Sequence, residues 1–263
     1  MKRFWLLAAV VVFVSCSCIA EDIPEWDYPI KPEILSDPSG YITLTDPDHL
    51  LASDYVPNDL VTVTVRKVVS GELRRVAHDA LKDMFDAAEA DGYKLYAKSV
   101  YRSYQTQKTM YANRLQKVGR DDGVVAAPGS SDHQTGLGID ILNYEWTKKE
   151  GMTPAFGETE EAQWMAAHCH EYGFIIRYME DKEDVTGIIY EPWHLRYVGV
   201  EAASYIMENH LSLEEFTADW QSYVARYEAE GGDFEELVRQ RTGITRITVL
   251  EITEDGEEEL SIF

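Results

Sequence analysis

The spacing of hydrophobic and polar residues along the chain predicts a mixture of strands and helices. Three short segments rich in β-branched or apolar residues predict strands; they are residues 62–68, 95–100 and 174–178. Three longer segments carry apolar residues at helical spacing and end at or just before a glycine; they are residues 70–92, 103–119 and 159–172. We expect an α+β fold with a mostly antiparallel central sheet, which carries the functional site on one face and helices on the other.

The residues after 200 predict a helical extension that ends in a β-hairpin. Ser212 and Glu215 have the spacing of a capping box at the start of a helix that runs to about residue 230. Two strand-like segments flank an Asp-Gly pair and predict the hairpin; they are residues 246–253 and 257–263.

Residues 131–140, Ser-Asp-His-Gln-Thr-Gly-Leu-Gly-Ile-Asp, combine an imidazole and a terminal carboxylate with two glycines. Glycine is unfavourable inside a helix, so we interpret the stretch as a strand. In a strand, both glycines share a face with Asp140, and the aliphatic residues beside them lie on the opposite face. The apolar face then packs into the core, while the glycine face leaves room for close approach next to His133.

His133 and Asp140 are suitable ligands for a divalent metal such as zinc, provided that a third ligand exists. We expect a strand from residue 188 to carry the sequence Tyr-Glu-Pro-Trp-His, which offers His194 three residues after the carboxylate of Glu191. Two histidines and one aspartate leave one position of a tetrahedral zinc open for water, as in catalytic sites. A regular pleat would place Glu191 and His194 on opposite faces, so a shared site requires the chain to twist or break between them. Without a metal, His133 and Asp140 would be a structural hydrogen-bonded pair.

Three motifs in this order resemble those of the VanY-type D-alanyl-D-alanine carboxypeptidases, which belong to the LAS group of zinc peptidases. The motifs are Tyr-Arg-Ser-Tyr-Gln-Thr-Gln at 101–107, S-x-H-x-x-G-x-[AG]-x-D at 131–140 and E-P-W-H at 191–194. Residues 172–178 and 191–199 also resemble the family, and the resemblance covers roughly residues 53–212. It implies a peptidase of bacterial cell-wall metabolism with one Zn²⁺ per chain, bound by His133, Asp140 and His194.

Five side chains are candidates for catalysis or substrate binding. Glu191 neighbours a ligand without being needed as one, so we expect it to act as the base that moves protons from water to the leaving amine. The resemblance places Arg102 near the scissile carbonyl or the terminal carboxylate of the substrate, and a guanidinium suits either task. It places Gln107 and Ser131 at the free carboxylate of the terminal D-residue, and Trp193 is a candidate wall of the pocket. The structural alternatives are a surface carboxylate, a surface ion pair, a solvent-facing glutamine, a turn serine and a core tryptophan.

Composition narrows the classes of partner and the cellular location. The formal net charge of −23 argues against binding to nucleic acid or to an anionic membrane, because both need basic surfaces. Residues 1–20 have the charge order of a signal peptide or N-terminal anchor, and Cys16 or Cys18 is a candidate for lipidation. Cys169 then has no disulfide partner, and we expect a buried free thiol.

We divide the chain into four parts: a signal peptide or anchor at 1–20, a linker at 21–52, a catalytic core at 53–212 and a C-terminal extension at 213–263. The resemblance implies an exported zinc D,D-carboxypeptidase that removes the C-terminal D-alanine from peptidoglycan stem peptides at the cell membrane or cell wall. We expect a monomer that contacts the membrane only through its N-terminus or a lipid. The alternatives are an L,D-carboxypeptidase on tetrapeptide stems, an inert wall-binding protein and a phage-type endopeptidase. The motifs do not distinguish the L,D-carboxypeptidase from the D,D-carboxypeptidase.

Overall fold

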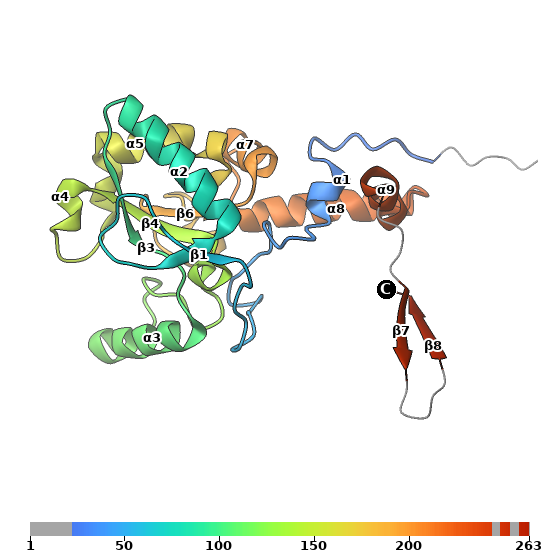
Figure 1. Cartoon of the computed structure of the whole chain (residues 1–263), viewed down its shortest axis with the longest axis horizontal. Helices are drawn as coiled ribbons and strands as arrows, with labels where there is room; N and C mark the ends of the chain where they lie inside the picture. Colours follow the sequence, from blue (N-terminus) through green and yellow to red (C-terminus); the bar gives the residue numbers. More distant parts are fainter. Residues whose placement is uncertain (1–22, 244–247, 253–257, 263) are drawn as a thin grey trace, which may run out of the picture.

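A four-stranded antiparallel sheet forms the centre of the protein in the computed structural model, which describes residues 23–243, 248–252 and 258–262 (Figure 1). The strand order is β3-β4-β6-β5, and the bounds are β3 Leu95–Ser99, β4 Gly138–Asn143, β6 His194–Tyr197 and β5 Phe174–Ile176. Each neighbouring pair runs antiparallel. The expected α+β class with an antiparallel central sheet is therefore confirmed.

Helices cover one face of this sheet and leave the other face to the candidate site. The covering helices are α2 (Arg75–Ala90), α5 (Glu160–His168) and α7 (Val200–Glu208), which lie on the same side in Figure 1. Ile139 and Leu195 of the sheet are 0% exposed and belong to the core beneath these helices. Because successive strand residues point to opposite faces, Asp140 and His194 lie on the second face. Helix α3 (Tyr104–Val118) lies on that side (Figure 1).

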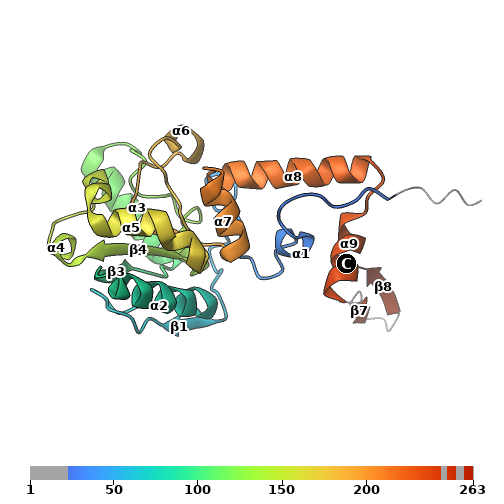
Figure 2. The ribbon, with the colours of Figure 1, turned by 90° about the horizontal axis from the view of Figure 1, so that it is seen from above.

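Shorter elements flank the sheet, and α8 extends away from it in both views (Figures 1 and 2). The remaining helices and strands of the described residues are α1 Pro32–Leu35, β1 Leu60–Thr62, β2 Glu72–Arg74, η1 Asp132–Thr135, α4 Tyr144–Thr147, η2 Pro154–Glu158, η3 Cys169–Tyr172, α6 Glu183–Thr186, α8 Leu213–Ala229, α9 Phe234–Thr242, β7 Thr248–Ile252 and β8 Glu258–Ile262. The last two strands pair antiparallel with each other, which confirms the hairpin.

Several predicted helix starts coincide with capping side chains. Ser103 accepts a hydrogen bond from the backbone N–H of Thr106 at the start of α3, and Thr159 does the same at α5. Ser212 and Glu215 form the reciprocal capping box at the start of α8. These caps satisfy backbone N–H groups that have no partner inside the helix, so a few residues suffice to define the boundary.

The first predicted helix begins later than expected. Helix α2 starts at Arg75 instead of near residue 70, and the three residues before it form β2, which pairs with β1. Because Leu73 fits a buried position in either period, the hydrophobic pattern misplaced this boundary. The strand expected over residues 62–68 is also wrong, since β1 ends at Thr62.

Only the second half of the stretch 131–140 is a strand. Residues Asp132–Thr135 form η1, Gly136 ends this turn with a φ of 69°, and β4 starts at Gly138. The expectation of one continuous strand was wrong, because Gly136 adopts a left-handed conformation that glycine tolerates. The expected close approach to bare backbone does occur at Gly138, where an added Cβ would lie 2.9 Å from the backbone carbon of Asp132.

The segment expected to be a linker is packed against the protein. Tyr28, Ile30, Leu35 and Ile42 are at most 9% exposed and form a second core cluster with residues of α7 and α8. The linker interpretation of residues 21–52 fails for this part because a few well-placed apolar residues bury it, although the segment is rich in Pro, Asp and Ser. The segment therefore contributes to the stability of the folded protein.

Within the part of the chain that the structure describes, no helix combines the length and the apolar character needed to cross a membrane. The expected signal peptide or anchor at residues 1–20 lies outside that part and stays a prediction. The division of the chain at residues 52 and 212 is likewise a prediction.

Candidate active site

The pairing of β4 with β6 places Asp140 directly opposite His194. His133, carried by η1, joins them from the turn that precedes β4. One ligand atom from each of these three buried residues lies within 4.8 Å of the other two. The structure therefore brings together the three residues that we predicted as metal ligands.

The hydrogen bonds of the two imidazoles leave one nitrogen of each turned toward Asp140. Nδ1 of His133 lies 2.8 Å from the carbonyl oxygen of Val100, so it carries the proton, and Nε2 lies 3.4 Å from Oδ2 of Asp140. Nδ1 of His194 lies 2.9 Å from Oδ1 of Asp140. Two imidazole nitrogens and a carboxylate thus converge on one point, a donor set that could hold a divalent metal ion.

The charge states of Asp140 and His133 suit a cation, whereas His194 must first lose a proton. Burial alone would raise the pKa of Asp140, but His133 and His194 beside it hold that pKa well below its usual range, so the carboxylate stays ionised. Burial, together with the nearby Arg102 guanidinium, lowers the pKa of His133 and keeps this ring neutral. Burial would also lower the pKa of His194, but Asp132 and Asp140 raise it to about 9, so a metal ion would displace a proton there.

Glu191 reaches the same site because the chain turns between it and His194. The backbone N–H of His194 donates to the carbonyl of Glu191 (3.0 Å), and Pro192 and Trp193 form the turn. The expected strand carrying both residues is therefore wrong, and the break that a shared site requires is present. Burial raises the pKa of Glu191 to about 8, against the opposing effect of His194.

Arg102 is held in place by two neighbouring side chains. Its Nη1 donates to Oε1 of Gln107 (2.6 Å) and its Nη2 donates to Oγ of Ser99 (3.0 Å). The amide nitrogen of Gln107 in turn donates to the carbonyl of Ala126 (2.6 Å). The guanidinium is therefore oriented before any substrate arrives.

All eight predicted site residues line one cavity of about 270 Å³: Arg102, Gln107, Ser131, His133, Asp140, Glu191, Trp193 and His194. Trp193 is 3% exposed and also belongs to the main hydrophobic core, so it combines the two roles that its sequence context left open. The cavity is also lined by Met110 and Arg114 of α3 and by Met152.

Sequence reasoning missed a buried charge cluster beneath His194. Asp132, Arg177 and Arg196 are at most 1% exposed, and the aspartate bonds to both arginines. The sequence did contain a signal for this cluster, because each arginine interrupts an apolar segment that is typical of a buried strand. Charged residues in such positions are almost always paired.

The remaining histidines are not part of the candidate site, and Cys169 behaves as expected. His49, His78, His168, His170 and His210 neither line the cavity nor join the ligand group among the described residues. Cys169 is a buried free thiol, and burial raises its pKa to about 12.

Comparison with known proteins assigns the chain to a family. Residues 70–200 match the family VanY, D-alanyl-D-alanine carboxypeptidase. The putative carboxypeptidase YodJ of Bacillus subtilis is 42% identical over 193 residues, which cover 70% of this chain and 69% of the relative. A D-alanyl-D-alanine carboxypeptidase of Enterococcus faecalis is 37% identical over 147 residues, which cover 52% of each protein.

Solved structures agree with this assignment. The LdcB LD-carboxypeptidase is 40% identical with a TM-score of 0.62, and the match covers 74% of this chain and 92% of that one. A variant of the vancomycin-resistance D,D-pentapeptidase VanY, solved with Zn(II), is 30% identical with a TM-score of 0.56, covering 67% and 98%. The fold and the site are those of a hydrolytic peptidase. The chain belongs to the VanY family of D-alanyl-D-alanine carboxypeptidases.

Proposed function

We propose that this protein is a zinc-dependent D-alanyl-D-alanine carboxypeptidase that removes the C-terminal D-alanine from peptidoglycan stem peptides. The observation that carries the proposal is the convergence of His133, Asp140 and His194 in one cavity with Glu191 and Arg102. A zinc ion held by the first three would supply a Lewis acid and lower the pKa of a water molecule. The donor set and its burial support zinc over a hard cation that prefers oxygen ligands alone.

Glu191 is the proposed proton shuttle. Hydrolysis adds the oxygen of water to the scissile carbonyl carbon, breaks the C–N bond and requires a proton on the leaving amine. A buried carboxylate with a pKa raised toward neutrality can accept the proton of water and return it to that amine. Glu191 lines the cavity and is not among the converging ligand atoms, so it is free for this task.

Arg102 is the proposed electrostatic partner of the substrate. Its fixed guanidinium can stabilise the negative charge that develops on the carbonyl oxygen or bind the terminal carboxylate. Gln107, Ser131 and Trp193 line the same cavity, and we propose that they contact the terminal D-residue. Gln107 has a second task, since its amide also orients Arg102.

The 40% identity to the LdcB LD-carboxypeptidase favours a second candidate function, L,D-carboxypeptidase activity on tetrapeptide stems. D,D-specificity is favoured by the VanY structures, one of which is a complex with D-alanine-D-alanine. An inert wall-binding protein would not need a complete set of ligands and base. We propose that the exported, monomeric protein acts at the extracellular face of the cell membrane or in the cell wall. Its only contact with the membrane would be through residues 1–20 or a lipid attached there.

Mass spectrometry of the products formed from pentapeptide and tetrapeptide stems tests the proposal. We expect the zinc-loaded protein to release one alanine from the pentapeptide and to lose this activity with a chelator. Cleavage of the tetrapeptide alone would keep the site and move the specificity to L,D. Chelator-insensitive cleavage would reject zinc dependence, and cleavage of neither substrate would reject both carboxypeptidase readings.

A further inference from the structure

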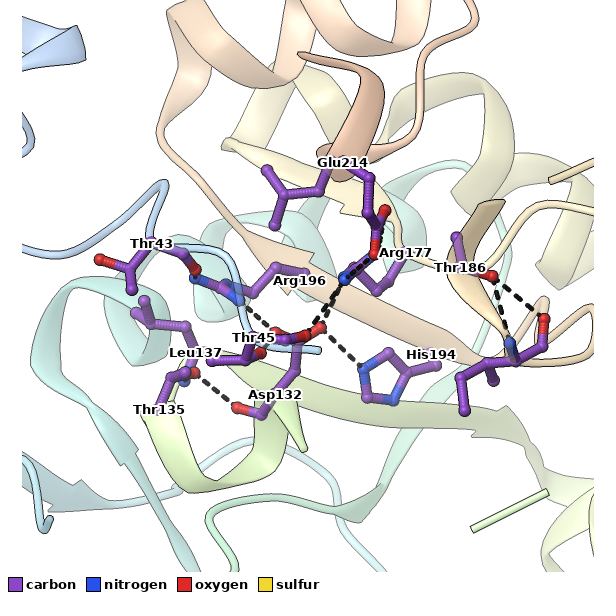
Figure 3. Close-up of polar contacts among 12 residues, drawn as sticks. Thr43, Thr45, Asp132, Thr135, Leu137, Arg177, Thr186, His194, Arg196 and Glu214 are labelled. Carbon is purple, nitrogen blue, oxygen red and sulfur yellow. Dashed lines mark hydrogen bonds and ion pairs between the residues drawn. The ribbon is translucent and has the colours of Figure 1, made fainter. Parts of the chain in front are cut away.

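Asp132 lies at the centre of a buried network of charges. It is 1% exposed, and Thr45 donates its hydroxyl to Oδ1 (2.6 Å). Arg196 donates to the same oxygen, and Nε of Arg177 donates to Oδ2 (2.8 Å). Figure 3 shows the carboxylate between the two arginines and the ring of His194. Asp132 is therefore fixed from three sides.

The network extends beyond the residues that match the family. Glu214, in the first turn of α8, accepts two hydrogen bonds from Arg177 (2.8 and 2.7 Å). The second Nη of Arg196 donates to the carbonyl oxygens of Tyr41 and Thr43 (3.0 and 2.8 Å). The family match covers residues 70–200, so the N-terminal segment and α8 both supply partners from outside it.

The charges of this network balance. Two carboxylates, Asp132 and Glu214, face the guanidinium groups of Arg177 and Arg196, whose side chains are 0% exposed. A buried guanidinium is tolerated only when its donors are satisfied. The carbonyl oxygens of Tyr41 and Thr43 accept hydrogen bonds from Arg196, so the N-terminal segment helps to satisfy this buried guanidinium.

The free side of Asp132 faces the second nitrogen of His194. Oδ2 lies 3.8 Å from Nε2, and this nitrogen is buried without a hydrogen-bond partner. If Nδ1 of His194 is a metal ligand, Nε2 carries the ring proton and needs an acceptor. Closing the gap to hydrogen-bond distance requires a shift of about 1 Å. Carboxylates in this position fix the orientation of metal-binding histidines.

We infer that Asp132 is a positioning residue for His194, and that Thr45 directly and Glu214 through Arg177 hold Asp132 in place from outside the family-matched region. The inference rests on the proposed zinc site. The network thereby couples the N-terminal segment and α8 to the geometry of one metal ligand.

Substitutions at two distances from His194 test this inference in the full chain. Asp132→Asn keeps the shape of the side chain and removes its charge. Thr45→Val removes the hydroxyl that donates to Asp132, whereas Thr45→Ser retains a hydroxyl at this position. Tyr28→Phe is the matched control, because Tyr28 donates to Asp219 (2.7 Å) and joins the same N-terminal segment to α8 without reaching Asp132.

Zinc affinity, measured by competition with a chromogenic chelator, and the visible spectrum of the Co²⁺-substituted protein are the readouts. We expect roughly 10–100-fold weaker zinc binding for Asp132→Asn and about threefold or more for Thr45→Val, each with a shifted Co²⁺ spectrum. Thr45→Ser and Tyr28→Phe should stay within about twofold of the parent, which is the margin we take as unchanged.

Unchanged affinity and spectrum in folded Asp132→Asn and Thr45→Val would overturn the inference. If Asp132→Asn does not fold, because it leaves two buried arginines underpaired, Thr45→Val decides alone. Equal losses in Thr45→Val and Tyr28→Phe would also overturn it, because they would indicate general loosening of the segment. A parent protein that does not bind zinc would instead refute the proposed function.

Discussion

Glu191 combines a buried position with a raised pKa, and these two properties make its role testable. We expect Glu191→Gln to lower kcat by roughly 10²–10⁴-fold, since the amide cannot accept a proton. Zinc content should stay at the level of the parent, because the three converging ligand atoms belong to other residues. Metal analysis and steady-state kinetics of the same preparation check both. The exposed Glu180→Gln is the control, and near-parental turnover of Glu191→Gln would rule out the shuttle.

The pH dependence of hydrolysis follows from the same carboxylate. Burial raises the pKa of Glu191 to about 8, and the base must be ionised, so kcat/KM should fall as the pH drops below this pKa. A bound cation favours the carboxylate, so the midpoint in the zinc-loaded enzyme should lie below 8. A pH–rate profile from about pH 5 to 9 tests this sign. A profile in which kcat/KM does not fall toward low pH would contradict the assignment of Glu191 as the base.

Among the elements, the turn between η1 and β4 depends on one glycine. Gly136 has a φ of 69°, and an added Cβ would lie 3.0 Å from side-chain atoms of Leu60 and Arg74. We expect Gly136→Ala to lower the free energy of unfolding by roughly 1–3 kcal/mol. Gly119→Ala is the control, because Gly119 has a φ of 81° but no atom within 4 Å of the added Cβ. Urea denaturation should show a larger loss of unfolding free energy for Gly136→Ala than for Gly119→Ala. Equal losses would mean that Leu60 and Arg74 move away from the added Cβ.

Element boundaries were predictable where a side chain closes the end of a helix. Ser103, Thr159 and Ser212 act locally on backbone N–H groups, so their sequence context carries the information. The boundary before α2 was not predictable in this way, because pairing with β1 decides that Glu72–Arg74 is extended. Strand pairing is a contact between segments, and the pattern of one segment does not contain it.

For the whole molecule, the N-terminal segment is part of the folded unit. Ile30 is 1% exposed in the second core cluster, so Ile30→Ala should destabilise the protein by about 2–4 kcal/mol. Ile23→Ala, at a position that is 73% exposed, should change stability by less than about 0.5 kcal/mol. Urea unfolding midpoints at constant slope compare the two. Parental stability of Ile30→Ala would indicate that the segment is not packed in solution.

The sequence by itself determined the residues of the candidate site, because His133, Asp140, Glu191 and His194 carry their chemistry in their side chains and occur at motif spacing. It also determined the α+β class, since the two hydrophobic periods are local properties of the chain. Only the tertiary structure decided how Glu191 and His194 share one site, because the turn at Pro192 and Trp193 overrides the pleat that alternation predicts. It alone also decided that Thr45 contacts Asp132 and that Glu214 is linked to Asp132 through Arg177, because buried charges find their partners through folding and not through sequence spacing.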